Sequence, residues 1–366
     1  MMVPTKEIIK TCDMEKLNAY RQYLLSHPRL TYLFVELTQQ CNLACFHCGS
    51  RCSPTNGVVL DSALLIQTLR ELAEDQQPHN IMICFTGGEP LLHHDFFEIV
   101  KETVNLGYPW GMTTNATTID ETSAHQLKDL GLSSVTVSLD GLEEQHDWLR
   151  NTKGAFQSTL HGITCLKAAS IPVQVTTVIH KQNLSQLDAM YQFLCDQGIP
   201  FWRIINIEPI GRALEHPELL LSFDEYFQLL DYIRAKRYSV LAPMEICFGC
   251  SHYLSFDYER EVRDNYFLCG AGFLVGSILA NGDISSCLDI ERRPELVQGN
   301  IQTDRFSNVW KNRFQIFRAD RAAQSSVCSV CQERNYCNGD SMHTWNFETR
   351  EPAICLVKKR SSYIIN

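Results

Sequence analysis

The chain has 366 residues, of which 45% are hydrophobic and 20% charged, and its formal net charge is -10. This composition is typical of a soluble globular protein with one large domain or two domains. An acidic chain lacks the basic surface that a phosphate backbone requires, so no nucleic-acid partner is expected. The N-terminus lacks the order of a signal peptide, and the longest apolar run, 273–280, is too short to span a bilayer. A cytoplasmic protein without a membrane partner is therefore expected.

The chain begins with a leader segment, 1–30, which has weak helical character and no obvious site. A β-like run, 32–37, follows, and directly after it stand Cys41, Cys45 and Cys48, with three and then two residues between them. Structural zinc sites and closed iron–sulfur clusters use four protein ligands. A set of three thiolates therefore indicates a four-iron cluster with one iron left open to a small molecule.

A second motif follows the next β-like run and consists of Gly87, Gly88, Glu89 and Pro90. The cysteine triplet and this GGEP segment together resemble the signature of the radical S-adenosylmethionine (SAM) superfamily. The resemblance implies that the triplet holds a [4Fe–4S] cluster that binds SAM, and that the backbone of the GGEP segment binds the amino group of SAM. It also places His47, the residue before the third cysteine, near the adenine. A zinc knuckle is the alternative, and Cys52 is interpreted as a spare thiol.

From 31 to 240, short β-branched or aromatic runs alternate with amphipathic helical stretches, which predicts parallel β/α units. Six strands are expected, at 32–37, 81–86, 110–114, 134–139, 172–179 and 202–207. Helices are expected after Asp61 as an N-cap, from Asp95 as a cap to Gly107, and at about 120–130, 155–169, 185–197 and 223–237. The predicted fold class is α/β, a partial (β/α)6 TIM-like barrel with its site at the C-terminal ends of the strands.

Three further residues lie at or after the predicted strand ends, and the family resemblance gives them roles. In relatives, the residues that match Asn115, Ser138 and Arg150 often contact the ribose or the carboxylate of SAM. An ordinary turn or capping residue is the alternative for each. His93 and His94 stand beside the GGEP segment and are interpreted as helix-entry residues.

Beyond residue 240 the alternation stops and cysteines dominate. These cysteines are Cys269, Cys287, which follows five residues after Gly282, then Cys328, Cys331 and Cys337 in a CX2CX5C pattern, and finally Cys355. Residues 281–283, Asn-Gly-Asp, predict a hairpin. The pattern resembles the SPASM extension of radical SAM enzymes, which holds auxiliary [4Fe–4S] clusters. Residues 241–366 are therefore predicted to be a SPASM domain with a small β-hairpin, helices and two auxiliary clusters.

One position departs from the SPASM pattern, because Ser341 stands where a further cysteine is expected. A CxxC pair upstream offers a replacement. The interpretation assigns one cluster to Cys247, Cys250, Cys269 and Cys287, and the other to Cys328, Cys331, Cys337 and Cys355. Asp340, Ser341 or an open iron that meets substrate are alternatives to Cys247. A zinc ribbon is the alternative for either group, since paired CxxC units are also zinc spacing.

The resemblance implies reductive cleavage of SAM to methionine and a 5′-deoxyadenosyl radical, which removes a hydrogen atom from a substrate. The leading hypothesis is a maturase that oxidises a peptide or protein side chain, giving a cross-link, a thioether or a related change, with an external electron donor of the flavodoxin or ferredoxin type. A small-molecule dehydrogenase, a sulfatase-maturing enzyme and a zinc-stabilised scaffold are alternatives. An epimerase is another, with Cys84, Cys165 or Cys195 as hydrogen donor.

Overall fold

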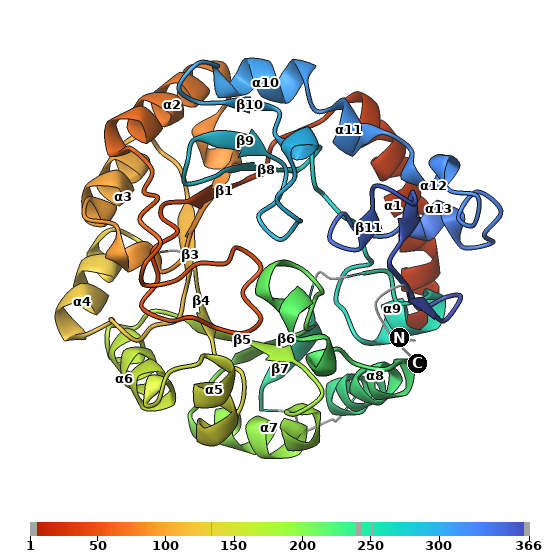
Figure 1. Cartoon of the computed structure of the whole chain (residues 1–366), viewed down its shortest axis with the longest axis horizontal. Helices are drawn as coiled ribbons and strands as arrows, with labels where there is room; N and C mark the ends of the chain where they lie inside the picture. Colours follow the sequence, from red (N-terminus) through yellow and green to blue (C-terminus); the bar gives the residue numbers. More distant parts are fainter. Residues whose placement is uncertain (1–5, 133, 239–242, 250–251, 362–366) are drawn as a thin grey trace, which may run out of the picture.

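The computed structural model describes residues 6–132, 134–238, 243–249 and 252–361. Within these ranges, one ten-stranded sheet curves round toward itself, and helices cover most of its outer side (Figure 1). The strand order from one edge to the other is β10-β9-β8-β1-β2-β3-β4-β5-β6-β7. We call the space inside the curved sheet the lumen.

All six expected strands form and pair in parallel, which confirms the barrel-like part of the prediction. They are β1 Tyr32–Glu36, β2 Met82–Thr86, β3 Trp110–Thr114, β4 Ser134–Ser138, β5 Val173–Ile179 and β6 Phe201–Asn206. A further parallel strand that the sequence did not predict, β7 Glu245–Phe248, pairs with β6.

The other edge of the sheet comes from the cysteine-rich part of the chain. β8 Val275–Ile278 pairs in parallel with β1, and β9 Asp283–Ser285 and β10 Gly299–Asn300 add antiparallel strands. The predicted hairpin at 281–283 is confirmed, since it joins β8 to β9. The sheet thus continues on both sides of residue 240, and the division into domains at that residue stays a prediction.

The barrel helices occur where the sequence predicts them, with one addition, α5. They are α2 Ser62–Asp75, α3 Phe96–Asn105, α4 Glu121–Asp129, α5 Glu143–Leu149, α6 Ala155–Ala168, α7 Leu187–Asp196 and α8 Phe223–Arg237. Before them lies α1 Lys6–Ser26. The C-terminal elements are short: α9 Phe256–Glu261, α10 Phe306–Asn312, α11 Gln315–Arg318, α12 Arg321–Gln324, α13 Arg334–Cys337, and the two-residue strands β11 Trp345–Asn346, β12 Glu351–Pro352, β13 Ile354–Cys355 and β14 Arg360–Ser361. Among the helices of the described ranges, none is long and apolar enough to cross a membrane.

The two predicted N-caps behave differently. Asp61 caps α2 by accepting a hydrogen bond from the Leu64 amide at 2.8 Å, as predicted. Asp95 stands at the N-cap of α3, as predicted, but its side chain makes no capping hydrogen bond. Its carboxylate instead accepts the hydroxyl of Ser62 at 2.5 Å, which ties α3 to the start of α2. His93 is buried at the entry to α3, as expected, with its ring against the carbonyl of Leu60 at 2.9 Å.

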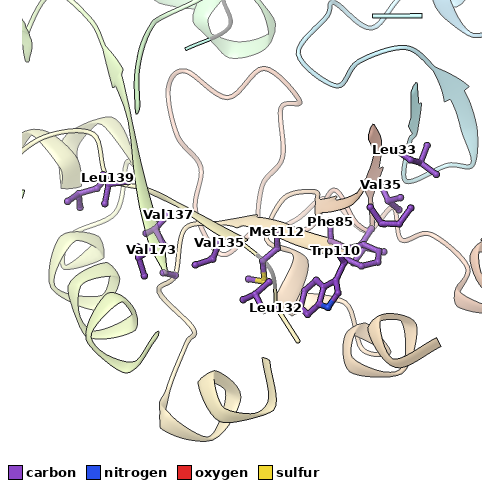
Figure 2. Close-up of a cluster of buried hydrophobic side chains, with 14 of the residues drawn as sticks. Leu33, Val35, Phe85, Trp110, Met112, Leu132, Val135, Val137, Leu139 and Val173 are labelled. Atoms are coloured by element: carbon purple, nitrogen blue, oxygen red, sulfur yellow. The ribbon is translucent and has the colours of Figure 1, made fainter. Parts of the chain in front are cut away.

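The hydrophobic core lies between the sheet and its helices. Figure 2 shows part of it, where Val35, Phe85 and Trp110 from three neighbouring strands point to the same side of the sheet. Residues alternate along a strand, so the intervening side chains point into the lumen. Burial of the outer face stabilises the sheet and leaves its inner face free to carry a site.

Candidate active site

A cavity of about 270 Å³ lies at the C-terminal ends of the barrel strands. Cys41, Cys45 and Cys48 all line it, from the loop that follows β1. Cys41 and Cys45 are buried, and Cys48 is half-buried. The structure therefore brings the triplet together where the sequence predicts the site, and the role of these thiols as iron ligands stays a prediction.

Burial disfavours the thiolates of Cys41 and Cys45, so a positive charge in the cavity would stabilise them. Burial raises the pKa of the Cys41 thiol to about 12, and it also raises the pKa of Cys45 although Arg150 opposes it. A buried thiol binds a metal as the thiolate, and the metal charge then offsets the cost of burial. Three thiolates on one cavity wall form a soft donor set that suits iron–sulfur chemistry.

The GGEP segment packs against the cysteine loop at distances that only glycine allows. The Gly88 amide donates to the Thr38 carbonyl at 2.6 Å. A Cβ on Gly88 would lie 2.1 Å from the Gln40 carbonyl oxygen, and one on Gly87, whose φ is +154°, would lie 2.5 Å from the carbonyl oxygen of Thr38. These glycines line the cavity and fix the distance between β2 and the cysteine loop.

Glu89 is fully buried and joins the ends of two strands. Its carboxylate accepts hydrogen bonds from the Thr114 hydroxyl at 2.7 Å and from the backbone amide of Asn115 at 2.9 Å. Burial raises its pKa to about 7. Glu89 and Pro90, which is also buried, are not among the residues that line the cavity, so their predicted contact with SAM stays a prediction.

Asn115, Ser138 and Arg150 all line the cavity, as the resemblance implies. The side-chain amide of Asn115 donates to the Asn42 side chain at 2.9 Å, and its nitrogen lies 3.8 Å from the sulfur of Cys41. A guanidinium nitrogen of Arg150 lies 3.6 Å from the sulfur of Cys45. Both side chains thus reach the cysteine triplet directly.

Asp140, which stands just after β4, holds Arg150 in place. The two side chains are buried and form an ion pair at 2.5 Å. Burial alone would raise the pKa of Asp140, but the Arg150 guanidinium, two histidines and a backbone hydrogen bond together outweigh this effect and hold the pKa below its ordinary value. The pair therefore stays charged and directs the guanidinium at Cys45.

His47 lines the same cavity and is neutral. Burial lowers its pKa to about 3, although Asp140 lies 3.7 Å from its Nε2 atom. Its buried Nδ1 atom has no hydrogen-bond partner among the described residues. A buried polar atom without a partner is costly, so this nitrogen fits a bound ligand.

Arg212 is a site residue that sequence reasoning missed. Its side chain donates to the carbonyls of Cys45 at 2.7 Å and Cys52 at 2.8 Å, and its amide donates to the carbonyl of Cys48 at 3.0 Å. The preceding Gly211 has φ +57°, and a Cβ there would lie 2.4 Å from the Cys48 carbonyl oxygen. The Gly-Arg pair after the sixth strand was the available signal.

The C-terminal cysteines fall into two groups with different support. Cys328 is buried and Cys331, Cys337 and Cys355 are half-buried. Burial, the Asp340 carboxylate and the thiols of Cys328 and Cys331 together raise the pKa of Cys355 to about 11, so these groups lie close together. Cys337 likewise interacts with Cys328 and Cys355. The four thiols predicted for one cluster are therefore neighbours.

The other predicted set is less complete. Cys247, Cys269 and Cys287 are half-buried, and Cys250 lies outside the described residues. Among the described residues, no three His, Cys, Asp or Glu side chains are arranged to hold a single metal ion. A cubane cluster separates its ligand sulfurs further than one ion does, so both ligand sets stay predictions. Ser341 is buried with its hydroxyl 3.3 Å from that of Thr344, and Asp340 is buried beside it.

Comparison with known proteins identifies the family. The model of the radical SAM superfamily matches residues 35–194, and that of the SPASM iron–sulfur cluster-binding domain matches residues 269–332. Mycofactocin maturase MftC of Mycobacterium tuberculosis is 30% identical over 313 residues, which cover 84% of this chain and 77% of MftC. The chain belongs to the radical SAM superfamily.

Other similar proteins of this superfamily differ in the activities that their names state. AdoMet-dependent heme synthase of Oleidesulfovibrio alaskensis is 27% identical over 333 residues, covering 85% of this chain and 82% of the synthase. Among solved structures, anSMEcpe with bound AdoMet and Cp18Cys peptide has a TM-score of 0.71 at 17% identity, covering 91% of this chain and 95% of that one. SuiB of Streptococcus suis bound to S-adenosylmethionine has a TM-score of 0.68 at 17% identity, covering 91% and 75%. These structures confirm the fold.

A radical SAM domain uses a [4Fe–4S] cluster and SAM, and a SPASM domain binds auxiliary iron–sulfur clusters. The residues present fit these groups. Three thiols meet at one cavity, a buried ring nitrogen of His47 faces no protein partner, and Gly87 and Gly88 expose backbone at the cavity wall. The prediction that these residues hold the cluster and SAM is consistent with that arrangement.

Proposed function

We propose that this radical SAM enzyme acts on a peptide or protein side chain and leaves it oxidised, through a cross-link, a thioether or a related maturation of a ribosomally made peptide. SAM on its cluster supplies a 5′-deoxyadenosyl radical, which removes a hydrogen atom from an unactivated C–H bond. An external donor of the flavodoxin or ferredoxin type supplies the electron. The chain positions the reactants and excludes water.

The observation that carries the proposal is the composition of the cavity wall. Val178, Ile205 and Ile207 give it an apolar surface beside the cysteine loop. The two arginines that line it are engaged, Arg150 by Asp140 and Arg212 by backbone carbonyls of the cysteine loop. Such a wall suits a peptide side chain and has no uncommitted arginine for a substrate with several carboxylates.

The chain's own residues have separable tasks in this proposal. Asp140 keeps Arg150 charged beside Cys45, and Arg212 holds the cysteine loop by its carbonyls. Asp289 and His343, from the cysteine-rich part of the chain, line the cavity as well. They bring the cysteine-rich part of the chain to the cavity wall, and a site that excludes water protects a reactive radical.

The solved structures support a peptide substrate only through the peptides that are bound in them. The anSMEcpe structure contains the Cp18Cys peptide, and a SuiB structure contains the precursor peptide SuiA. At 17% and 18% identity they share only the fold with this chain. The proposal for this chain draws on that shared fold and on the cavity wall.

A second candidate comes from the sequence relatives. AdoMet-dependent heme synthases and an Fe-coproporphyrin III synthase of Methanosarcina barkeri are 27% identical to this chain over 333 to 360 residues. This similarity favours a tetrapyrrole substrate, and the committed arginines of the cavity argue against it.

One experiment separates the two candidates. The anaerobically reconstituted enzyme is incubated with SAM, a reductant and either a short peptide encoded beside its gene or Fe-coproporphyrin III. The proposal expects the peptide to lose two hydrogen atoms by mass spectrometry and to raise 5′-deoxyadenosine formation. An unchanged peptide together with consumption of Fe-coproporphyrin III would replace the first candidate by the second.

A further inference from the structure

A chain of buried hydrogen bonds ends at a carboxylate of the active-site cavity. Glu208 follows β6 and lines this cavity together with Ile205 and Ile207. These two isoleucines belong to the apolar wall that suits a peptide side chain. The wall therefore carries one group that can accept a proton where the substrate is expected to lie.

Asn206, the last residue of β6, fixes the direction of the Glu208 carboxylate. Its side-chain amide donates to Oε1 of Glu208 at 3.2 Å and to the Ile207 carbonyl at 3.0 Å. Its side-chain oxygen accepts the hydroxyl of Tyr226, which lies on α8, at 2.5 Å. Because both hydrogens and the oxygen of this amide are engaged, the amide cannot turn over.

The same hydroxyl determines which nitrogen of buried His252 carries the proton. Nε2 of His252 contacts the Tyr226 hydroxyl. This hydroxyl donates its one hydrogen to Asn206, so it accepts from Nε2, and Nε2 carries the ring proton. Burial lowers the pKa of His252 well below its ordinary value, so the ring is neutral. Its Nδ1 atom therefore presents a lone pair.

That lone pair faces the Glu208 carboxylate. Nδ1 of His252 lies 3.5 Å from Oε1 of Glu208. It is buried and has no hydrogen-bond partner among the described residues. Two acceptors that face each other are unfavourable until a hydrogen lies between them. A carboxylic acid at Glu208 supplies that hydrogen. The cavity wall thus has a place prepared for one additional proton.

We propose that Glu208 accepts the proton that the substrate loses during its oxidation, and that His252 then accepts a hydrogen bond from the new carboxylic acid. This rests on the proposed function and deepens it. One hydrogen atom leaves a C–H bond to the 5′-deoxyadenosyl radical, and one electron leaves the substrate to an auxiliary [4Fe–4S] cluster. One proton leaves a neighbouring S–H, N–H or C–H bond to Glu208, and the new bond forms between the two atoms that lost hydrogen. The product is then two hydrogen atoms lighter.

Two other residues of the cavity wall carry lone pairs, Asp289 and His343. Nδ1 of His343 contacts the Asp289 carbonyl at 2.8 Å. Asp289 is exposed, whereas the Glu208 side chain is only 13% exposed. A base that is enclosed beside apolar groups exchanges protons with the substrate instead of with bulk water. This difference favours Glu208.

The test measures the ratio of product to 5′-deoxyadenosine in anaerobic turnovers with a peptide that the wild type modifies. Glu208→Gln should still form 5′-deoxyadenosine, because removal of the hydrogen atom precedes loss of the proton. Its ratio should fall about 100-fold, as is typical when a general base is removed. Tyr226→Phe should also lower the ratio, because His252 can then carry its proton on Nδ1 and stabilise the Glu208 carboxylate. Glu121→Gln, exposed on α4, is the matched control and should keep the wild-type ratio.

Iron content and the change in the electron paramagnetic resonance spectrum on addition of SAM report whether Glu208→Gln keeps its cofactors, and both should match the wild type. Should this variant lose iron, Glu208→Asp replaces it. That variant keeps the charge but withdraws the carboxylate from the substrate, so its ratio should fall as well.

A normal ratio in the Glu208 variant that keeps its iron would overturn the proposal. So would a parallel fall of 5′-deoxyadenosine and product in that variant, or a low ratio in Asp289→Asn alone. Failure of the proposed function is seen separately, since the wild type itself would then modify no peptide, and the need for a proton acceptor would end with it.

Discussion

At the scale of single residues, the cavity depends on a short chain of buried polar contacts. Asp140 fixes Arg150, and Arg150 reaches the sulfur of Cys45 at 3.6 Å. Each contact is buried, so each is strengthened by the low local dielectric and is costly to leave incomplete. The Cys45 thiol thus faces a positive charge before any metal binds, although burial still raises its pKa.

Replacing Cys45 by alanine should abolish 5′-deoxyadenosine formation. The substitution removes one of three predicted iron ligands at the cavity, so the open iron that SAM needs is not held. Anaerobic assays with SAM and a reductant, read by chromatography, measure the product. Cys195→Ala, on α7, is the matched control and should keep the normal rate. Normal cleavage by Cys45→Ala would mean that the cofactor binds elsewhere.

Glu89→Gln should become more stable relative to the wild type as the pH rises. Burial raises the pKa of Glu89 from 4.5 to about 7, so between these values the unfolded chain ionises while the folded protein keeps its proton. The wild type should therefore lose about 3 kcal/mol of stability over this range, and glutamine, which does not titrate, should not.

Urea unfolding of the cluster-free proteins at several pH values between 4.5 and 8 measures this difference in the free energy of unfolding. Comparing the two proteins at each pH removes the contributions of the buried histidines, which titrate in both. A difference that stays constant with pH would show that Glu89 ionises normally in the fold.

At the scale of elements, the sequence predicted what local pattern encodes. The six strands and the capped helix α2 follow from alternation and from Asp61. The four-residue strand β7 and the seven-residue helix α5 are too short to show a period. Pairing of β8 with β1 joins residues far apart in the chain, and no local signal carries it.

The same limit applies to the site. The spacing of residues located the triplet and the GGEP segment. The chemistry of the triplet requires thiol side chains, and the close packing of the GGEP segment requires glycine. Arg212 acts on backbone carbonyls, which any sequence supplies, so the Gly-Arg pair after the sixth strand is only a weak signal for it. The burial that pairs Asp140 with Arg150 is a tertiary property and is likewise absent from the local pattern.

Gly88→Ala should disrupt the site through the packing of two loops. The new Cβ would lie 2.1 Å from the Gln40 carbonyl oxygen and 2.9 Å from the Cβ of Cys41, so the cysteine loop must move. A shift of about 1 Å at a reacting centre costs on the order of 100-fold in rate, and we expect such a fall in 5′-deoxyadenosine formation. Gly57 lies in the cysteine loop, and a Cβ there would have nothing within 4 Å. Gly57→Ala should therefore keep the normal rate of 5′-deoxyadenosine formation. Equal rates for both variants would show that this close packing is unimportant.

At the scale of the whole molecule, the cysteine-rich part of the chain is built into the barrel. Arg292 forms a two-point ion pair with buried Glu36 at the end of β1, with distances of 2.6 and 3.2 Å. At the other side, Arg21 of α1 donates to the carbonyls of Asn335 at 2.9 Å and Tyr336 at 2.8 Å, and Figure 1 shows α1 beside α13. These contacts hold the C-terminal cysteines in a fixed position relative to the cavity of the cysteine triplet.

Replacing both Cys328 and Cys331 by alanine should therefore separate the cleavage of SAM from the formation of product. These thiols lie in the C-terminal group, outside the residues that line the SAM cavity, so 5′-deoxyadenosine should still form. The amount of product should fall sharply if the cluster predicted at Cys328, Cys331, Cys337 and Cys355 accepts the electron that leaves the substrate. Iron analysis should show a loss of about four irons per chain, as expected for one cubane. Normal product formation with that iron missing would mean that the cluster only stabilises the fold, and a parallel loss of SAM cleavage would mean that the two sites fold as one unit.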